Sequence, residues 1–248
     1  MTDDNLSLDG IRAILFDLDG TLRHSRPAYS RALFDFAARM GVTGSDEQRR
    51  RALRWMYYYF ADSPEIGQDF QALKDDHDLF MTNYLRRYLI AYDCPPEKAA
   101  DLAPEIFHRM SEELQSMDWV DPDTPETLRV LKQSGFTLGV VSNRREPFHD
   151  ALEELGLGSY FDFTLAAGEV NSWKPDVLIF QHAVQRAGSR PACTLYVGDN
   201  YFADIVGAQR AGLKPVLLDP ERIFPEAECP VICSLGELRA GLHLPESF

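Results

Sequence analysis

The hydrophobic and polar residues follow one pattern in the two end segments of the chain and another in the middle block. Residues 11–16 form a mainly apolar run, which is typical of a strand buried in a parallel sheet. From about Asp121 onward, short strand-like runs alternate with helix-like segments, which is the βα pattern of a parallel sheet with covering helices. A single parallel strand cannot stand alone, so we expect the first run to join this later sheet.

The elements expected after Asp121 follow one another closely. The helices are predicted at 125–133, 147–155, 176–187 and 203–211. The strands are predicted at 137–141, 163–165, 194–197 and 215–218. A surface connection at 219–230, a short strand at 231–233 and a last short helix complete the pattern.

The middle block, from about Ser25 to Met117, has no convincing strand and predicts helices only. Its apolar residues recur at helical spacing. Two stripes are clear, Leu33, Phe36, Ala37 and Met40 in the first, and Leu53, Met56, Tyr57 and Phe60 in the second. Two further helices are predicted at 70–92 and 96–117. The block therefore reads as a helical insertion after the first strand.

The expected fold class is α/β, a Rossmann-like doubly wound parallel sheet with an all-helical domain inserted after its first strand. The expected core domain is 1–22 with 120–248, and the inserted domain is 23–119. A chain of 248 residues is long enough for a core domain that carries a smaller insertion.

Composition narrows the class of protein and its partners. With 45% hydrophobic and 26% charged residues the chain is an ordinary globular protein, and a net charge of −14 argues against a nucleic-acid surface. The four cysteines show no metal-site spacing, and sparse cysteines fit a reducing compartment. The polar start of the chain and the lack of a long apolar run predict a cytoplasmic protein without membrane association. A monomer and a homodimer both remain open.

Polar residues stand where the predicted strands end. Ligands of open α/β sheets bind outside the carboxyl ends of the strands, so these side chains should converge. They are Asp17, Asp19, Ser142, Asn143, Lys174, Asp199 and Asp204. Asp17, Asp199 and Asp204 form an oxygen-rich anionic set, which suits Mg²⁺. Ser142, Asn143 and Lys174 supply the neutral donors and the positive charge that a transferring phosphoryl group needs.

This set predicts chemistry on a phosphate monoester. The carboxylate of Asp17 can attack phosphorus to form an aspartyl-phosphate, while Asp19 protonates the departing alcohol and later takes a proton from water. Gly20 allows the backbone to approach the phosphate closely, and the hydroxyl of Thr21 can cap the turn. We therefore expect Gly20 and Thr21 to help bind phosphate.

The four segments resemble, in order and strand context, the motifs of the haloacid dehalogenase superfamily. They are Asp17-Leu18-Asp19-Gly20-Thr21, Ser142 after its strand, Lys174-Pro175, and Gly198-Asp199 followed by Asp204. The helical insertion resembles the cap of the subclass that includes phosphoglycolate phosphatases and 2-haloacid dehalogenases. The resemblance implies that Asp17 is nucleophile and Mg²⁺ ligand, Asp19 is acid/base and a ligand through its backbone carbonyl, and Asp199 is a ligand. It gives Asp204 either a metal-binding role or the orientation of Lys174.

The resulting hypothesis is a Mg²⁺-dependent phosphatase that acts on a small phosphorylated metabolite. A phosphotransferase of the mutase type would use the same residues with a sugar hydroxyl as acceptor. Two further alternatives are less favoured by the sequence. A 2-haloacid dehalogenase usually lacks the second acid, which is Asp19 here, and a catalytically idle relative that binds partners would not need the motif residues. Arg144 and Arg145, which follow Asn143, and Arg23 and His24, at the entry to the insertion, are open to either substrate contact or a solvated surface role.

Overall fold

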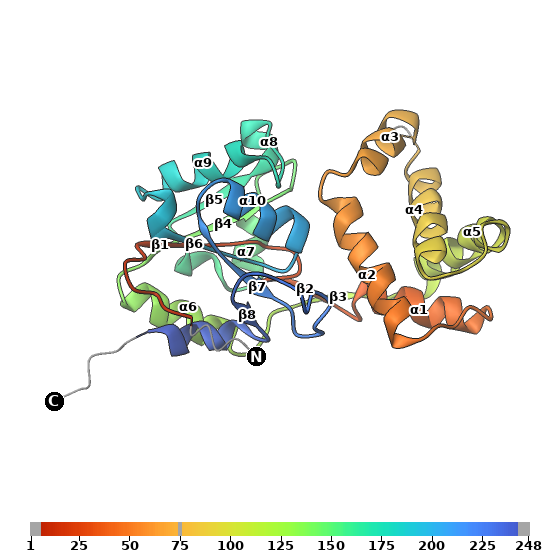
Figure 1. Cartoon of the computed structure of the whole chain (residues 1–248), viewed down its shortest axis with the longest axis horizontal. Coiled ribbons are helices and arrows are strands. Elements are labelled where there is room, and N and C mark those ends of the chain that lie inside the picture. Colours follow the sequence, from red (N-terminus) through yellow and green to blue (C-terminus); the bar gives the residue numbers. More distant parts are fainter. Residues whose placement is uncertain (1–5, 74–75, 243–248) are drawn as a thin grey trace. The chain divides into compact units, whose positions relative to one another are not determined.

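The computed structural model describes residues 6–73 and 76–242, which fall into two compact units (Figure 1). One unit comprises Met1–His24 and Trp119–Phe248, and the other comprises Ser25–Asp118. The inserted unit therefore begins two residues later than the sequence pattern suggested and ends one residue earlier. In the described part of the chain, no helix has both the length and the apolar character that a membrane crossing requires.

The first unit contains a six-stranded parallel sheet, so the α/β fold class predicted from the sequence is confirmed. The strand order is β5-β4-β1-β6-β7-β8, with every pair parallel. The strands are β1 (Ala13–Phe16), β4 (Thr137–Ser142), β5 (Phe163–Ala166), β6 (Thr194–Gly198), β7 (Lys214–Leu218) and β8 (Val231–Ile232). The first strand lies inside the sheet, between β4 and β6, and all four of its side chains are buried.

Side chains from β1 enter two hydrophobic cores, one on each face of the sheet. Ile14 and Phe16 belong to the core that includes residues of α6 (Thr124–Gln133) and α7 (His149–Glu154). Ala13 and Leu15 belong to the core that includes residues of α9 (Val177–Arg186) and α10 (Val206–Arg210). Successive strand residues point to opposite faces, so an apolar run without alternation requires helices on both sides. This three-layer arrangement leaves the strand ends as the place where polar side chains can meet.

The helices of this unit lie close to their predicted positions, with differences at their ends. They are α6 (Thr124–Gln133), α7 (His149–Glu154), α8 (Ala167–Val170), α9 (Val177–Arg186), α10 (Val206–Arg210) and the short 3₁₀ segments at Gly158–Tyr160, Pro191–Cys193 and Leu235–Gly241. The predicted helix 203–211 begins earlier, with a π-helical turn at Tyr201–Ile205 before α10. The short α8 was not predicted, because four residues carry no measurable periodicity.

The second unit is helical, with α1 (Tyr29–Arg39), α2 (Asp46–Phe60), α3 (Pro64–Leu73), α4 (His77–Ala91) and α5 (Pro96–Glu113). The prediction of one helix over 70–92 was wrong, although residues 74 and 75 within it lie outside the described part. A new helix starts after Asp76, whose backbone is extended and whose carboxylate accepts from Leu79 N at 2.9 Å. A capping carboxylate at this position marks a helix start.

The second predicted stripe of the inserted unit was only partly right. Leu53 of α2 is buried, whereas Phe60 is 43% exposed. The buried aromatic of this helix is Tyr59, which donates a hydrogen bond to the buried carboxylate of Asp69 on α3 at 2.9 Å. Arg87 of α4 pairs with the same carboxylate at 2.9 Å. A buried polar network thus ties three helices together, which an apolar periodicity cannot reveal.

Two short strands lie where the chain passes between the units. They are β2 (His24–Arg26) and β3 (Met117–Trp119), and they form a separate two-stranded sheet. The rings of His24 and Trp119 lie with their centroids 5.8 Å apart. The expectation that the region from Ser25 to Met117 contains no strand was therefore wrong at its two ends, where three residues are too few to show alternation.

Candidate active site

The carboxyl ends of three neighbouring strands bring most of the predicted residues together. Phe16 at the end of β1 pairs with Val140 of β4 on one side and with Val197 of β6 on the other. Asp17 follows β1 directly, and its N–H donates to Val197 O at 2.9 Å. Ser142 is the last residue of β4, and Gly198, which ends β6, precedes Asp199. The parallel register thus places motif residues that are far apart in sequence at one edge of the sheet.

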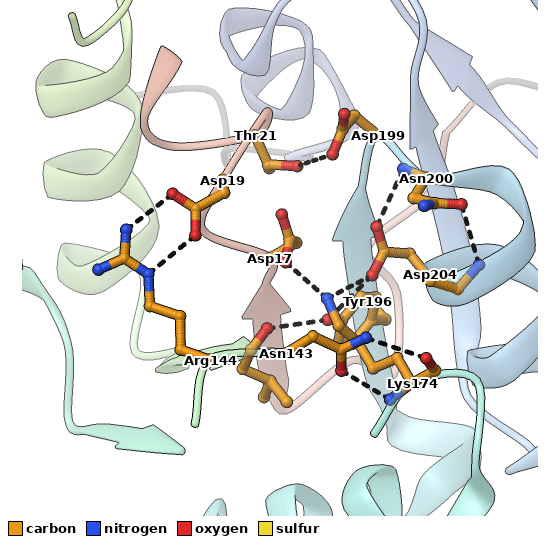
Figure 2. Close-up of polar contacts among 12 residues, drawn as sticks. Asp17, Asp19, Thr21, Asn143, Arg144, Lys174, Tyr196, Asp199, Asn200 and Asp204 are labelled. Atoms are coloured by element: carbon orange, nitrogen blue, oxygen red, sulfur yellow. Dashed lines mark hydrogen bonds and ion pairs between the residues drawn. The ribbon is translucent and has the colours of Figure 1, made fainter. Parts of the chain in front are cut away.

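Lys174 joins two buried carboxylates at the centre of this edge (Figure 2). Its Nζ lies 2.5 Å from Asp17 Oδ1 and 2.6 Å from Asp204 Oδ1, and all three side chains are nearly inaccessible to solvent. Burial alone would lower the pKa of Lys174, but the charges of Asp17 and Asp204 outweigh it and raise that pKa well above the ordinary value. The two carboxylates therefore favour the charged ammonium form of Lys174.

The acidic groups outnumber this one ammonium group, which makes the site suited to a further cation. Asp17, Asp199 and Asp204 each offer an oxygen within 4.8 Å of the others. Burial, opposed by Lys174 and assisted by the charge of Asp204, raises the pKa of Asp17 to about 7. Burial and the charge of Asp17 also raise the pKa of Asp199 well above its ordinary value. Carboxylate oxygens with excess negative charge fit Mg²⁺, which would favour their ionised form.

Asp204 is bound by donors on both oxygens. Its Oδ1 accepts from Lys174 and from the hydroxyl of Tyr196 at 3.4 Å, and its Oδ2 accepts from Asn200 N at 3.0 Å. The π-helical turn at Tyr201–Ile205 carries this side chain inward, and a Cβ at Gly198 would lie 2.4 Å from its Cγ. Two roles were considered for Asp204, metal binding and the orientation of Lys174. These contacts favour the orientation of Lys174.

Asp199 lies against the loop that follows β1. It accepts a hydrogen bond from the hydroxyl of the fully buried Thr21 at 3.3 Å. Gly20 has a φ of +104°, and a Cβ at this position would lie 2.2 Å from Asp199 Oδ2. Glycine is therefore required both for the backbone conformation and for space. The N–H of Gly20 donates to Arg23 O at 2.8 Å, so it closes the turn and is not available to a phosphate oxygen.

Asp19 differs from the other acids because its carboxylate is turned toward Arg144 (Figure 2). The guanidinium of Arg144 donates to both oxygens, each at 2.9 Å, and Arg23 Nη1 donates to Oδ1 at 2.7 Å. Burial raises the pKa of Asp19, but the hydrogen bonds and charges of Arg144 and Arg23 outweigh it and hold that pKa below its ordinary value. The surroundings therefore raise the pKa of Asp17 and lower the pKa of Asp19, the two acids of the first motif.

Ser142 ends β4, and the next residue, Asn143, is hydrogen-bonded to Lys174. Ser142 is buried. The side-chain amide of Asn143 donates to Lys174 O at 3.0 Å and accepts from Lys174 N at 2.7 Å. Asn143 thereby holds the backbone that carries the ammonium group, and its second amide N–H is left for another acceptor.

Sequence reasoning missed three contributors, Arg144 as a partner of Asp19, and Tyr196 and Asn200 as partners of Asp204. Tyr196 looks like one more apolar strand residue, and only its position two residues before Gly198 hints at the site. Asn200 caps the π-helical turn by accepting from Phe202 N at 3.0 Å and Ala203 N at 3.1 Å, which is a common use of Asn after a strand. His24 lies beside Trp119, with the two ring centroids 5.8 Å apart.

Residues 11–212 match the protein family described as a hydrolase, haloacid dehalogenase-like hydrolase. The chain belongs to this family. The match covers all four motifs, so the resemblance to the haloacid dehalogenase superfamily seen in the sequence is confirmed, and the protein is a haloacid dehalogenase-like hydrolase.

Similar proteins of this hydrolase family include named phosphatases. Ribulose-1,5-bisphosphate 5-phosphatase of Halopiger xanaduensis is 32% identical over 212 residues, 84% of each chain. Phosphoglycolate phosphatase of Salmonella choleraesuis is 28% identical over 256 aligned positions, 97% of this chain and 96% of the relative. The solved structure of a HAD phosphatase from Thermococcus onnurineus has a TM-score of 0.53 and 26% identity, covering 92% of this chain and 96% of that one.

Proposed function

We propose that the protein is a Mg²⁺-dependent phosphatase that hydrolyses small phosphorylated metabolites through a phosphoryl group carried on Asp17. The observation that carries this proposal is the ion pair of Asp17 with Lys174 inside a cluster of carboxylates. A second acid, Asp19, follows Asp17 by two residues. The phosphatase names of similar proteins support the reaction class.

Asp17 has the features of a nucleophile that attacks phosphorus. Lys174 holds Oδ1, and among the described residues no donor is found for Oδ2. A bound Mg²⁺, held by Asp17, Asp199 and the backbone carbonyl of Asp19 with Asp204 nearby, would neutralise charge on the phosphate and keep Asp17 ionised. Lys174, Ser142, Asn143 and Thr21 are the proposed partners of the phosphoryl oxygens, with Gly20 providing the close backbone approach.

The proposed reaction has two steps. In the first, an Asp17 oxygen bonds to phosphorus, the bond from phosphorus to the alcohol oxygen breaks, and Asp19 gives its proton to that oxygen. In the second, a water oxygen bonds to phosphorus, the bond from Asp17 to phosphorus breaks, and Asp19 takes the water proton. The sum converts a phosphate monoester and water into an alcohol and inorganic phosphate, with both acids regenerated.

Arg144 and Arg23 hold the pKa of Asp19 below its ordinary value, which favours the base form of this acid in the substrate-free protein. The base form is the one that the second step needs. The first step needs the proton, and a phosphate bound close to Asp19 would bring negative charge that raises the pKa of its carboxyl. Proton uptake by Asp19 is thus expected to accompany substrate binding.

The paired acids and the anionic cluster weigh against dehalogenation, which attacks carbon and needs neither a second acid nor a metal. Within the proposal, residues 25–118 form the cap that selects the substrate. A mutase-type phosphotransferase would use the same site with a sugar hydroxyl in place of water.

Release of p-nitrophenol from p-nitrophenyl phosphate tests the proposal. We expect activity that needs Mg²⁺, disappears with EDTA, and is lost in Asp17→Asn. Asp76→Asn is the matched control, because Asn caps a helix as well as Asp does and this variant makes the same chemical change outside the site. An inactive wild type, or a fully active Asp17→Asn, would refute the proposal. A panel of nucleotides, sugar phosphates and small phospho-acids then identifies the substrate by kcat/KM.

A further inference from the structure

The geometry points to Arg144 as a positioning residue that fixes the orientation of the Asp19 carboxylate, and this inference rests on the acid/base role proposed above for Asp19. Arg144 Nε donates to Asp19 Oδ2 and Nη2 donates to Asp19 Oδ1, each at 2.9 Å. The planar guanidinium matches both carboxylate oxygens at once, and such a two-point contact fixes the plane of the carboxylate as well as its position.

Arg144 is itself held in place by its surroundings. Its carbonyl oxygen accepts from Gly168 N at 3.2 Å, and a Cβ at Gly168 would lie 1.8 Å from Arg145 O, so the backbone here packs tightly against α8. The guanidinium carbon lies 6.0 Å from the ring centroid of the buried Phe148. A donor fixed in this way loses little freedom when it orients another group.

The hydrogen bonds also distinguish the two oxygens of Asp19. A carboxylate has about four acceptor positions. Oδ1 accepts from both Arg144 and Arg23, whereas in the described part of the chain Oδ2 accepts from Arg144 Nε alone. Oδ2 is therefore the oxygen with an acceptor position to spare. It is the atom that gives a proton to the departing alcohol oxygen and later receives one from water.

The neighbouring Arg145 provides a matched control. It has the same side chain one position away and is exposed, and among the described residues its side chain makes no hydrogen bond or ion pair. Arg145→Ala should leave the kinetics unchanged, whereas Arg144→Ala should reduce kcat by about 10- to 100-fold, which is at or below the lower end of the roughly 10²- to 10⁴-fold contribution of general acid/base catalysis, because Asp19 itself is still present. KM should change by less than about threefold, since Arg144 holds Asp19 and not the substrate.

Substrates that differ in leaving group separate proton donation from other effects. Phenyl phosphate needs a proton on its departing oxygen more than p-nitrophenyl phosphate does. Because kcat/KM reports the first step, Arg144→Ala should lower kcat/KM for phenyl phosphate more than for p-nitrophenyl phosphate. Arg144→Lys keeps the charge and loses the two-point contact, so it should restore little of the lost rate.

The double variant Asp19→Asn with Arg144→Ala shows whether Arg144 acts through Asp19. If it does, adding Arg144→Ala to Asp19→Asn should lower kcat by less than about threefold further, because coupled residues are not additive. The inference is overturned if the two losses multiply, if Arg144→Ala raises KM with kcat unchanged, or if it matches Arg145→Ala. An inactive wild type would instead refute the phosphatase proposal itself, so the two failures are distinguishable.

Discussion

Asn143 and Lys174 are joined by a reciprocal pair of hydrogen bonds at 2.7 and 3.0 Å between a side-chain amide and a backbone 31 positions along the chain. The Lys174 ammonium group then reaches two buried carboxylates. The position of the positive charge in the site therefore depends on an uncharged residue that directly follows β4.

Asn143→Ala should release the backbone of Lys174 and misplace its ammonium group. Each lost hydrogen bond costs about 1 kcal/mol, so we expect a loss of about 1 to 3 kcal/mol in the free energy of unfolding, together with a lower kcat. Urea unfolding and steady-state kinetics measure the two effects. Asn83→Ala, at a half-buried position of α4 where the amide accepts one hydrogen bond from Arg86, is the control. Unchanged stability and kcat in Asn143→Ala would show that the pair does not position Lys174.

Gly20→Ala should weaken metal binding by displacing Asp199. The substitution places a Cβ 2.2 Å from Asp199 Oδ2 at a φ of +104°. Gly135→Ala separates backbone strain from the clash with a neighbouring side chain, since Gly135 has a φ of +86° but no atom within 4 Å of the added Cβ. Both variants should lose about 1 kcal/mol of stability from backbone strain, and only Gly20→Ala should need more Mg²⁺ for half-maximal activity. Equal Mg²⁺ requirements would contradict the role of Gly20.

Asp17→Asn should make the metal-free protein more stable at pH 8. Burial raises the pKa of Asp17 to about 7, so the folded chain keeps a proton that the unfolded chain loses near pH 4. Between these values the folded state binds more protons, so the free energy of unfolding falls as pH rises. Asp17→Asn removes this pH-dependent fall in the free energy of unfolding, which is on the order of 1 to 4 kcal/mol. Thermal unfolding in EDTA at pH 5 and pH 8 measures it, and a wild type that gains stability over this range relative to Asp17→Asn would contradict the prediction.

The main fold could be predicted from the sequence because its signals are local. The apolar run through Ile14 and Phe16 needs helices on both faces, and the alternation after Asp121 supplies them. The start of α4 was missed because apolar residues recur on both sides of the short polar run at 74–78, while the cap at Asp76 is a single side chain. Tyr59 and Asp69 likewise show their pairing only after the helices have packed.

The convergence of the candidate site could also be expected, since parallel strands end at one edge. Asp17 and Lys174 meet although 157 positions separate them. The individual hydrogen bonds could not be expected. Arg144 differs from Arg145 in sequence only by one position, yet the turn of the chain after β4 sends one guanidinium to Asp19 and leaves the other exposed. Side-chain direction in a loop depends on tertiary packing and not on local pattern.

The central claim is that the phosphoryl group passes through Asp17. Wild-type protein mixed with p-nitrophenyl phosphate and Mg²⁺, quenched rapidly in acid and digested, can be searched by mass spectrometry for a phosphorylated peptide. We expect one phosphoryl group on the Asp17 carboxylate during turnover, and none in Asp17→Asn. Rapid turnover that leaves Asp17 unmodified at every quench time, with Asp17→Asn still active, would contradict the account.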